Sequence, residues 1–218
     1  MYTLYCQNGT RATAAHMVLA ETGLRYELRQ IDITANEHRT PEFFAINPRG
    51  TIPVLVDDNG ATICETIAIM LYLADKHALE HLAPVPTDPL RATLLDWLVH
   101  HAAEVQEPVK RSYYAHRYAL RANDLEAVRE HANDAFQKRW QLVEEHLRQQ
   151  GPFHLGDRFS VVDIYLLVTS TYSGKLANSE FPAIEECSRR TAERPNIAPI
   201  LEDHRAGLER IAKLGVPQ

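Results

Sequence analysis

One short stretch carries most of the information about the fold of this chain: Asn47-Pro48-Arg49-Gly50-Thr51-Ile52-Pro53-Val54-Leu55. It ends in an apolar, β-prone run, and Pro53 stands at the start of that run, just after a glycine-containing turn. Because proline cannot donate to a strand ladder, this placement predicts a cis bond that turns the Ile52 backbone outward. A free N–H and C=O at a strand end can pair with an extended peptide. We therefore expect a peptide-binding strand end here.

The residues around this stretch alternate between β-prone runs and helical spacing. Residues 2–6 and 26–31 are typical of strands, and residues 12–19 between them have the apolar spacing of a helix. A strand, a helix and a strand in about thirty residues form a βαβ unit with parallel strands. Residues 53–64 hold two β-prone runs separated by Asn59-Gly60, which predicts an antiparallel hairpin. The order βαβ then ββα predicts a compact α/β domain.

The rest of the chain has the periodicity of helices. Apolar residues recur at helical spacing within 90–105, 125–147, 184–193 and 197–211, and Pro108 is expected to kink a long helix. Ser160-Val161-Val162-Asp163 has the form of a capping box before an almost wholly apolar helix start. We expect an all-helical domain.

A proline-containing connector separates the two halves. The expected organisation is an α/β domain at 1–78, a linker at 79–87 and an all-helical domain at 88–218.

The composition excludes several classes of protein. Of 218 residues, 45% are hydrophobic and 24% are charged, which excludes a disordered, fibrous or membrane-embedded chain. A net charge of −6 argues against a non-specific nucleic-acid binder. Three cysteines are too few for a disulfide framework. The first residues lack the layout of a signal peptide, so we expect a cytoplasmic protein that binds neither nucleic acid nor membrane.

Eleven histidines raise the question of a metal site. The adjacent His100 and His101 would point about 100° apart on a helix and cannot share one ligand face. No glycine-rich phosphate loop or nucleophile elbow is present. We expect histidines that lie on the surface, and no metal.

Glu65-Thr66 stands where the last β-prone run meets a helix. The free N–H groups and the dipole of a helix N-terminus bind a carboxylate, while the Glu65 side chain can hold an ammonium. An α-amino acid head group offers both charges. Together with the Ile52 strand end, this pair predicts a site for a small peptide with a free amino-acid end; the alternative is a structural turn followed by a helix cap.

The two segments together, with Tyr72-Leu73 and the Ser160–Ile164 box, resemble the soluble glutathione transferases of bacterial type, near the beta, phi and nu-like classes. The resemblance covers nearly the whole chain. It implies a thioredoxin-like N-terminal domain, an all-helical C-terminal domain, glutathione as co-substrate and a homodimer. The expected reaction is attack of the glutathione thiolate on an electrophile, or reduction of a disulfide or peroxide.

The resemblance also implies residues that bind glutathione. Ile52, next to Pro53, would pair its backbone with the cysteinyl part, and Glu65 and Thr66 would hold the γ-glutamyl end. Thr51 stands where relatives often have Gln or Lys, so its contact is expected to be weaker. A loop with a basic pair would lie near the glycyl carboxylate. That pair is His38 and Arg39.

The catalytic group departs from the family pattern. Relatives activate the thiol with a Tyr, Ser or Cys at the turn after the first strand, and here that turn is Cys6-Gln7-Asn8-Gly9-Thr10-Arg11-Ala12. Thr10 is the first candidate for donating to the thiolate and Asn8 the second, with Arg11 adding positive potential. The alternative is that Thr10 only caps the helix. Cys6 is expected to be a buried, inert thiol.

In the helical half, the resemblance places Gln106 where the beta class has a histidine that faces glutathione. It also makes Tyr113, Tyr114 and Arg117 candidates for a pocket that accepts an aromatic or anionic electrophile; packing against a neighbouring helix is the alternative. Because the usual catalytic residue is missing, a glutathione-binding carrier or interaction module with little catalysis remains the second hypothesis.

Overall fold

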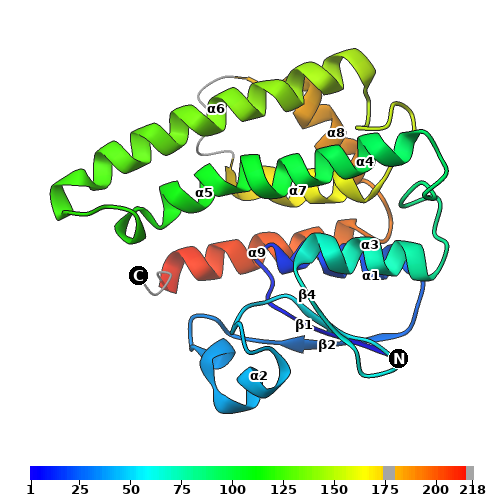
Figure 1. Cartoon of the computed structure of the whole chain (residues 1–218), viewed down its shortest axis with the longest axis horizontal. Helices are drawn as coiled ribbons and strands as arrows, with labels where there is room; N and C mark the ends of the chain where they lie inside the picture. The colour runs from blue at the N-terminus through cyan, green and yellow to red at the C-terminus, as the bar shows by residue number, and fades with distance from the viewer. Residues whose placement is uncertain (174–179, 215–218) are drawn as a thin grey trace. The chain divides into compact units, whose positions relative to one another are not determined.

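The computed structural model describes residues 1–173 and 180–214, and the chain divides into two compact units (Figure 1). The first holds residues 1–85 together with the chain from residue 192 through the last helix, and the second holds residues 86–191. The expected fold class is confirmed: a mixed sheet with helices, then an all-helical unit. The helix α9 (Ala198–Leu214) groups with the sheet. The domain boundaries expected from the sequence, with a linker at 79–87 between domains at 1–78 and 88–218, stay a prediction.

The sheet has four strands in the order β2-β1-β3-β4. β1 (Tyr2–Cys6) pairs in parallel with β2 (Tyr26–Gln30) and antiparallel with β3 (Val54–Val56). β3 pairs antiparallel with β4 (Thr62–Cys64), which confirms the predicted hairpin. The predicted βαβ and ββα halves therefore share the central pair β1 and β3.

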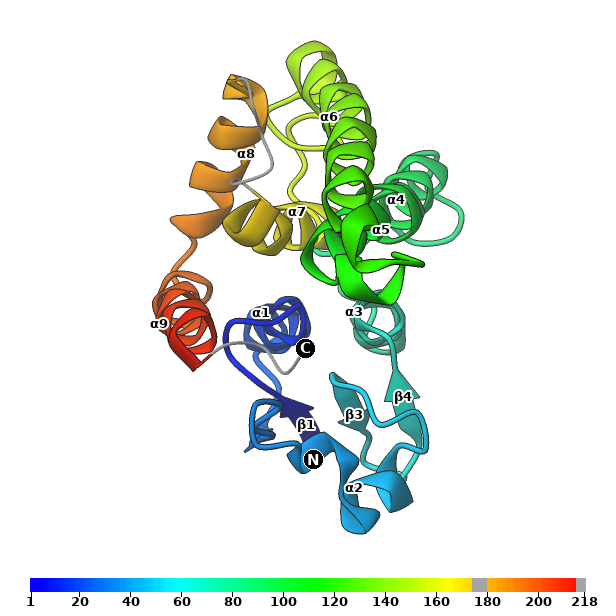
Figure 2. The same ribbon diagram turned by 90° about the vertical axis from the view of Figure 1, so that its left-hand side faces the viewer.

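Helices cover both faces of this sheet. Figure 2 shows α1 (Ala12–Thr22) and α3 (Thr66–Lys76) side by side on one face and α2 (Pro41–Ile46) on the other. The sequence analysis did not expect α2, although Thr40 and Pro41 carry its start signals. The Thr40 hydroxyl accepts the N–H of Phe43 at 3.2 Å, and Pro41 occupies the first helical position.

Polar contacts hold α9 against α1 within this unit. His204 Nδ1 lies 2.8 Å from the Thr13 hydroxyl, and both side chains are buried. Arg194, just before α9, donates to the buried Glu21 carboxylate at 2.5 Å. α1 ends at Gly23, whose φ of 68° is left-handed.

The second unit is built from helices that pack around a buried core. The elements are α4 (Leu90–Val99), a π-helical segment (His100–Val105), α5 (Gln106–Tyr113), two 3-10 turns (Ala115–Arg117 and Ala122–Asp124), α6 (Leu125–Gln150), α7 (Val161–Ser173) and α8 (Pro182–Ala192). α6 packs along α5 in both views (Figures 1 and 2). None of the described helices has the length and apolar character needed to cross a membrane.

The expected irregularity near Pro108 takes the form of the π-helical segment just before it. Pro108 has no N–H, so the carbonyl of Glu104, four residues earlier, has no partner from that position. Short π-helical segments of this kind accommodate an extra residue in a helix and are frequent at functional sites.

One of the two reciprocal bonds of the capping box predicted at Ser160–Asp163 is present at the start of α7. The Asp163 carboxylate accepts both the backbone N–H and the hydroxyl of Ser160, at 2.8 and 3.1 Å. The helix that follows is buried on nearly all sides, as its apolar sequence predicts, and it lies at the centre of the unit.

Candidate functional site

The predicted strand end has the expected backbone geometry. The Ile52–Pro53 peptide bond is cis, and Pro53 is buried while Ile52 is half-buried. Within the described chain, neither the N–H nor the C=O of Ile52 has a hydrogen-bond partner. Both groups are therefore available to an extended peptide, as in strand addition.

Glu65 occupies the junction between β4 and α3 in a strained conformation. Its φ of 88° and ψ of 121° are uncommon for a residue with a side chain, and such strain of about 1–3 kcal/mol is characteristic of functional sites. The Glu65 side chain is 75% exposed and lies 3.3 Å from the Arg49 guanidinium. Thr66, the first residue of α3, is buried, and the N–H groups of this first turn have no acceptor within the helix.

The loop between α2 and β3 brings the predicted basic pair to the same region. Gly50 has a φ of 57°, and a Cβ there would lie 2.9 Å from Arg39 Nη1 and 3.1 Å from the carbonyl oxygen of His38. Asn47 holds the loop closed by donating to the Thr51 carbonyl at 2.7 Å. His38 and Arg39 therefore lie against the loop that leads into Ile52.

The environment of His38 keeps it uncharged. Partial burial lowers the pKa of His38, and the Arg39 guanidinium lowers it further. Its Nδ1 is buried without a partner in the described chain. Arg39 and Arg49 therefore supply positive charge in this region, and Glu65, paired with Arg49, supplies negative charge.

The turn after β1 places Thr10 as a cap on α1. The Thr10 hydroxyl donates to the carbonyl of Gln7 at 2.7 Å and accepts the N–H of Ala12 at 3.2 Å. Arg11 is the residue that precedes α1. Asn8, by contrast, makes no side-chain hydrogen bond to the described residues. The hydroxyl proton of Thr10 is engaged, whereas the Asn8 amide is available.

A cavity of about 400 Å³ opens beside Asn8, within the first unit. It lies between the ends of β1 and β2 and one side of α9. Its lining is Gln7, Asn8, Gln30, Ile31, Asp32, Asp203, Ala206, Gly207 and Arg210. Arg210 bonds the Asp32 carboxylate at 2.6 Å across it. The sequence analysis missed the α9 residues because it assigned that helix to the other half of the chain.

Cys6 has the environment expected of an inert thiol. It is 1% exposed, and burial raises the pKa of its thiol to about 12. The thiolate form, which is the nucleophile, is therefore negligible at neutral pH.

The other predicted residues lie in the helical unit. Gln106 is buried at the start of α5, and its Oε1 accepts the Tyr172 hydroxyl at 2.6 Å. Tyr113 is 51% exposed. The Arg117 guanidinium lies 4.2 Å from the ring centre of Tyr114. The last three form a basic, aromatic patch at the end of α5.

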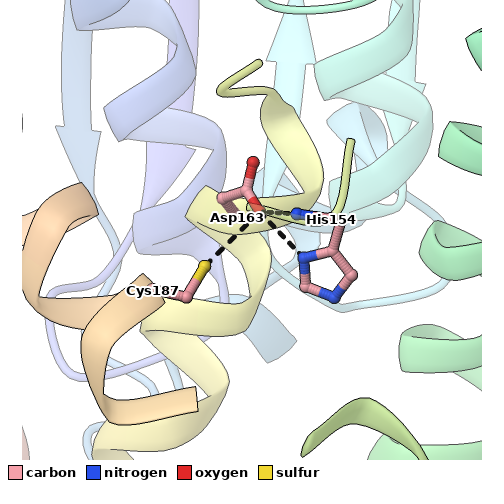
Figure 3. A group of neighbouring side chains, drawn as sticks. All are labelled: His154, Asp163 and Cys187. Carbon is pink, nitrogen blue, oxygen red and sulfur yellow. Dashed lines mark hydrogen bonds and ion pairs between the residues drawn. The ribbon is translucent and has the colours of Figure 1, made fainter. Parts of the chain in front are cut away.

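A buried polar group in the same unit has the residue types of a metal site. Ligand atoms of His154, Asp163 and Cys187 lie within 4.8 Å of one another (Figure 3). Each contact is a hydrogen bond to the carboxylate that caps α7, including 2.8 Å from His154 Nδ1 and 3.5 Å from Cys187. Burial raises the pKa of Cys187 far above its usual range. We assign the group to helix capping.

Comparison with known families matches both halves of the chain. Residues 10–76 match the N-terminal domain of glutathione S-transferases, and residues 104–204 match their C-terminal domain. Among curated proteins, glutathione S-transferase GstA of Escherichia coli O157:H7 is 27% identical over 201 residues, covering 91% of this chain and 96% of that protein.

Solved structures give the same result. A Sulfitobacter glutathione transferase homologue with bound glutathione superposes with a TM-score of 0.83 at 25% identity, covering 93% of this chain and 97% of that one. The glutathione transferase URE2P6 of Phanerochaete chrysosporium, in complex with oxidised glutathione, has a TM-score of 0.82 at 28% identity, covering 98% and 97%.

Proposed function

Because this chain belongs to the glutathione S-transferase family, we propose that it binds glutathione on its first unit and activates the thiol as a thiolate for attack on a second substrate. The observation that carries this proposal is the unpartnered backbone of Ile52 together with the strained, exposed Glu65 at the start of α3. A γ-glutamyl peptide needs both features.

The proposed contacts follow the charges of glutathione. Glu65 takes the γ-glutamyl ammonium, and the first N–H groups of α3, at Thr66, take its carboxylate. The Ile52 backbone pairs with the cysteinyl residue. Arg39, with His38 and Thr51 beside it, takes the glycyl carboxylate.

For the thiol, we propose Asn8 as the principal donor. Its amide has no hydrogen-bond partner among the described residues and Asn8 is part of the cavity lining, whereas Thr10 would have to release the Gln7 carbonyl before donating to sulfur. Arg11 and the α1 N-terminus add positive potential at the same turn. A free thiol has a pKa of about 8.5, so these groups have to stabilise the thiolate by about 1.4 kcal/mol for each unit by which its pKa falls.

The test is the thiolate absorbance of bound glutathione, followed in the ultraviolet from pH 5 to 9. We expect Asn8→Ala to raise the pKa of the bound thiol toward that of free glutathione, and Thr10→Ser to leave it unchanged. An unchanged pKa in Asn8→Ala, with a raised one in Thr10→Val, would transfer the donor role to Thr10.

The polarity of the cavity favours disulfide reduction as a second candidate activity. Charged side chains of both signs, Asp32, Asp203 and Arg210, suit a polar thiol compound better than a nitroaromatic ring. In this reaction the glutathione thiolate attacks one sulfur of a mixed disulfide. A new S–S bond forms, the old one breaks, and the departing thiolate takes up a proton.

Parallel assays with a chloronitrobenzene and a small glutathionyl mixed disulfide distinguish these chemistries. Faster turnover of the disulfide supports reduction, and faster turnover of the nitroaromatic supports transfer. Tight glutathione binding without either activity would support the carrier instead.

The remaining proposals concern the helical unit and the assembly. We propose Tyr113, Tyr114 and Arg117 as a pocket for an aromatic or anionic second substrate. Gln106, which is buried and accepts the Tyr172 hydroxyl, stays a sequence-based prediction of a glutathione contact. We also propose a cytoplasmic homodimer; light scattering at micromolar concentration tests the dimer.

A further inference from the structure

Four histidine rings surround one tryptophan inside the helical unit. The ring of Trp97 lies 4.3–6.2 Å, centre to centre, from those of His100, His101, His146 and His154. His101 and His154 are essentially inaccessible to solvent, which contradicts the expectation of surface histidines. Buried imidazoles need hydrogen-bond partners, because an unsatisfied one costs free energy.

His101, His154 and Asp163, the residue that caps α7, form one continuous line of hydrogen bonds. His101 Nε2 lies 3.0 Å from His154 Nε2, and His154 Nδ1 lies 2.8 Å from Asp163 Oδ1. Figure 3 shows the second contact, with Cys187 approaching the same carboxylate. The carboxylate also accepts the N–H of His154 at 3.0 Å and both donors of Ser160.

This geometry fixes where the protons lie when both rings are neutral. A carboxylate with four other donors is an acceptor, so His154 Nδ1 carries a proton and His154 Nε2 carries a lone pair. The His101 Nε2–H then donates to that lone pair. His101 Nδ1 is left as a buried acceptor with no partner in the described chain.

The line tolerates one additional proton but not two. A first proton, taken up at His154 Nε2, makes His154 a cation that pairs with Asp163. His154 Nε2–H then donates to His101 Nε2, and His101 carries its own proton on Nδ1 instead. A second proton would place N–H groups on both Nε2 atoms at a separation of 3.0 Å. Two cations with facing donors repel each other, so the rings have to separate.

We propose that His101, His154 and Asp163 form a buried proton-binding relay that makes the junction between the π-helical segment and the α7 cap acid-sensitive. His101 lies in the π-helical segment, and His154 precedes α7. The Nε2–Nε2 contact therefore joins two elements that are 53 residues apart.

The surroundings of His101 favour its neutral form. Burial lowers the pKa of His101 well below its usual range, and the neighbouring imidazoles lower it further. Titratable and charged groups face the cluster from every packed element: Asp96 on α4, His100 and Glu104 on the π-helical segment, Arg139 and His146 on α6, Asp163 and Tyr165 on α7 and Cys187 on α8.

A set of leucine variants tests the relay. We expect His101→Leu and His154→Leu each to lower Tm by about 4 °C or more at pH 8, because each leaves a buried nitrogen or oxygen without its partner. The fall in Tm of the double variant should be smaller than the sum of the two single falls, because the double variant removes both imidazoles of the Nε2–Nε2 contact. Additive losses would overturn the relay.

The dependence on pH gives a readout that packing alone would not change. Between pH 8 and pH 5, Tm of the parent should fall more steeply than Tm of the double variant, and the exposed His131→Leu should follow the parent. The other buried histidines are present in the parent and in every variant, so their contribution cancels when the two pH dependences of Tm are compared. Equal slopes in parent and double variant would overturn the proposal.

Nitrogen NMR of the parent chain covers the case in which a variant does not fold. At pH 8 we expect His154 protonated at Nδ1 and His101 protonated at Nε2. Protonation of His101 at Nδ1, or of His154 at Nε2 alone, would contradict the relay.

Discussion

Gly9 and Gly207 lie backbone against backbone: a Cβ on either would come within 2.4 Å of a backbone carbon of the opposing segment. For Gly207 that carbon belongs to Asn8, the proposed thiolate donor. The contact fixes the turn after β1 against α9, and only a residue without a side chain fits on either side.

Gly207→Ala should therefore destabilise the protein, although alanine is the better helix former by about 1 kcal/mol. We expect a loss of about 1–3 kcal/mol in the free energy of unfolding from overpacking, with a raised KM for glutathione. Urea unfolding and steady-state kinetics measure both. As a control, Gly60→Ala strains a residue at φ 82° but meets no atom within 4 Å, so it should cost stability alone. A Gly207→Ala variant that is more stable than the parent would contradict the close contact.

Glu65→Gln tests recognition of the amino-acid end. Removing the charge should weaken glutathione binding by at least about tenfold, since a hydrogen bond to a charged group contributes about 1.5–3 kcal/mol. Calorimetry measures the Kd. Glu27→Gln is the matched control, because Glu27 is also part of an exposed ion pair, with Arg29 at 2.8 Å. Equal affinities for the two variants would remove Glu65 from the site.

Gly50→Ala should act through Arg39. A Cβ at Gly50 would lie 2.8 Å from Phe44 Cε1 and 2.9 Å from Arg39 Nη1, so it would displace the Arg39 guanidinium together with the Phe44 ring. We expect KM for glutathione to rise several-fold in Gly50→Ala and in Arg39→Ala, and the double variant to be no worse than the more affected single one. If the increases in KM of the two single variants multiply in the double variant, Gly50→Ala does not act through Arg39.

Local signals explain what the sequence predicted. The hairpin followed from Asn59-Gly60, the cis bond from the position of Pro53, and the α7 cap from the Ser160–Asp163 spacing. Each depends on a few adjacent residues whose backbone preferences are strong. The short helix α2 was missed even though its signals were equally local.

Long-range pairing explains what the sequence could not predict. His101 and His154 are 53 residues apart, and the adjacent His100-His101 pair gave no sign that one ring is buried against a distant imidazole. The cavity beside Asn8 depends in the same way on α9, about 200 residues later in the chain. Such contacts come from tertiary packing, which no spacing along the chain encodes.

The three cysteines should differ in reactivity. Burial raises the pKa of all three thiols, but Cys6 and Cys187 are buried whereas Cys64 is half-buried. We expect a disulfide reagent at pH 8 to label Cys64 alone in the native protein and all three thiols in denaturant. Mass spectrometry of the labelled peptides identifies the sites. The Cys6→Ala variant should keep the activity of the parent protein. Loss of turnover in this variant with intact glutathione binding would make Cys6 a candidate nucleophile again.

His16 and His204 should make the first unit sensitive to acid. Burial lowers the pKa of both to about 4. The unfolded chain binds these protons near pH 6.5, so their contribution to stability is complete above pH 6.5 and is lost as the pH falls toward 4. Over that interval each histidine should reduce the free energy of unfolding by about 1 kcal/mol per pH unit. Urea unfolding of the parent and of His204→Asn at intervals from pH 7.5 to 4.5 measures the slope. His204→Asn keeps a polar group near Thr13 and should have a shallower slope, whereas the exposed His131→Asn should keep that of the parent. If His204→Asn keeps the full slope as well, His204 is already protonated in the folded protein and its burial does not control the acid response.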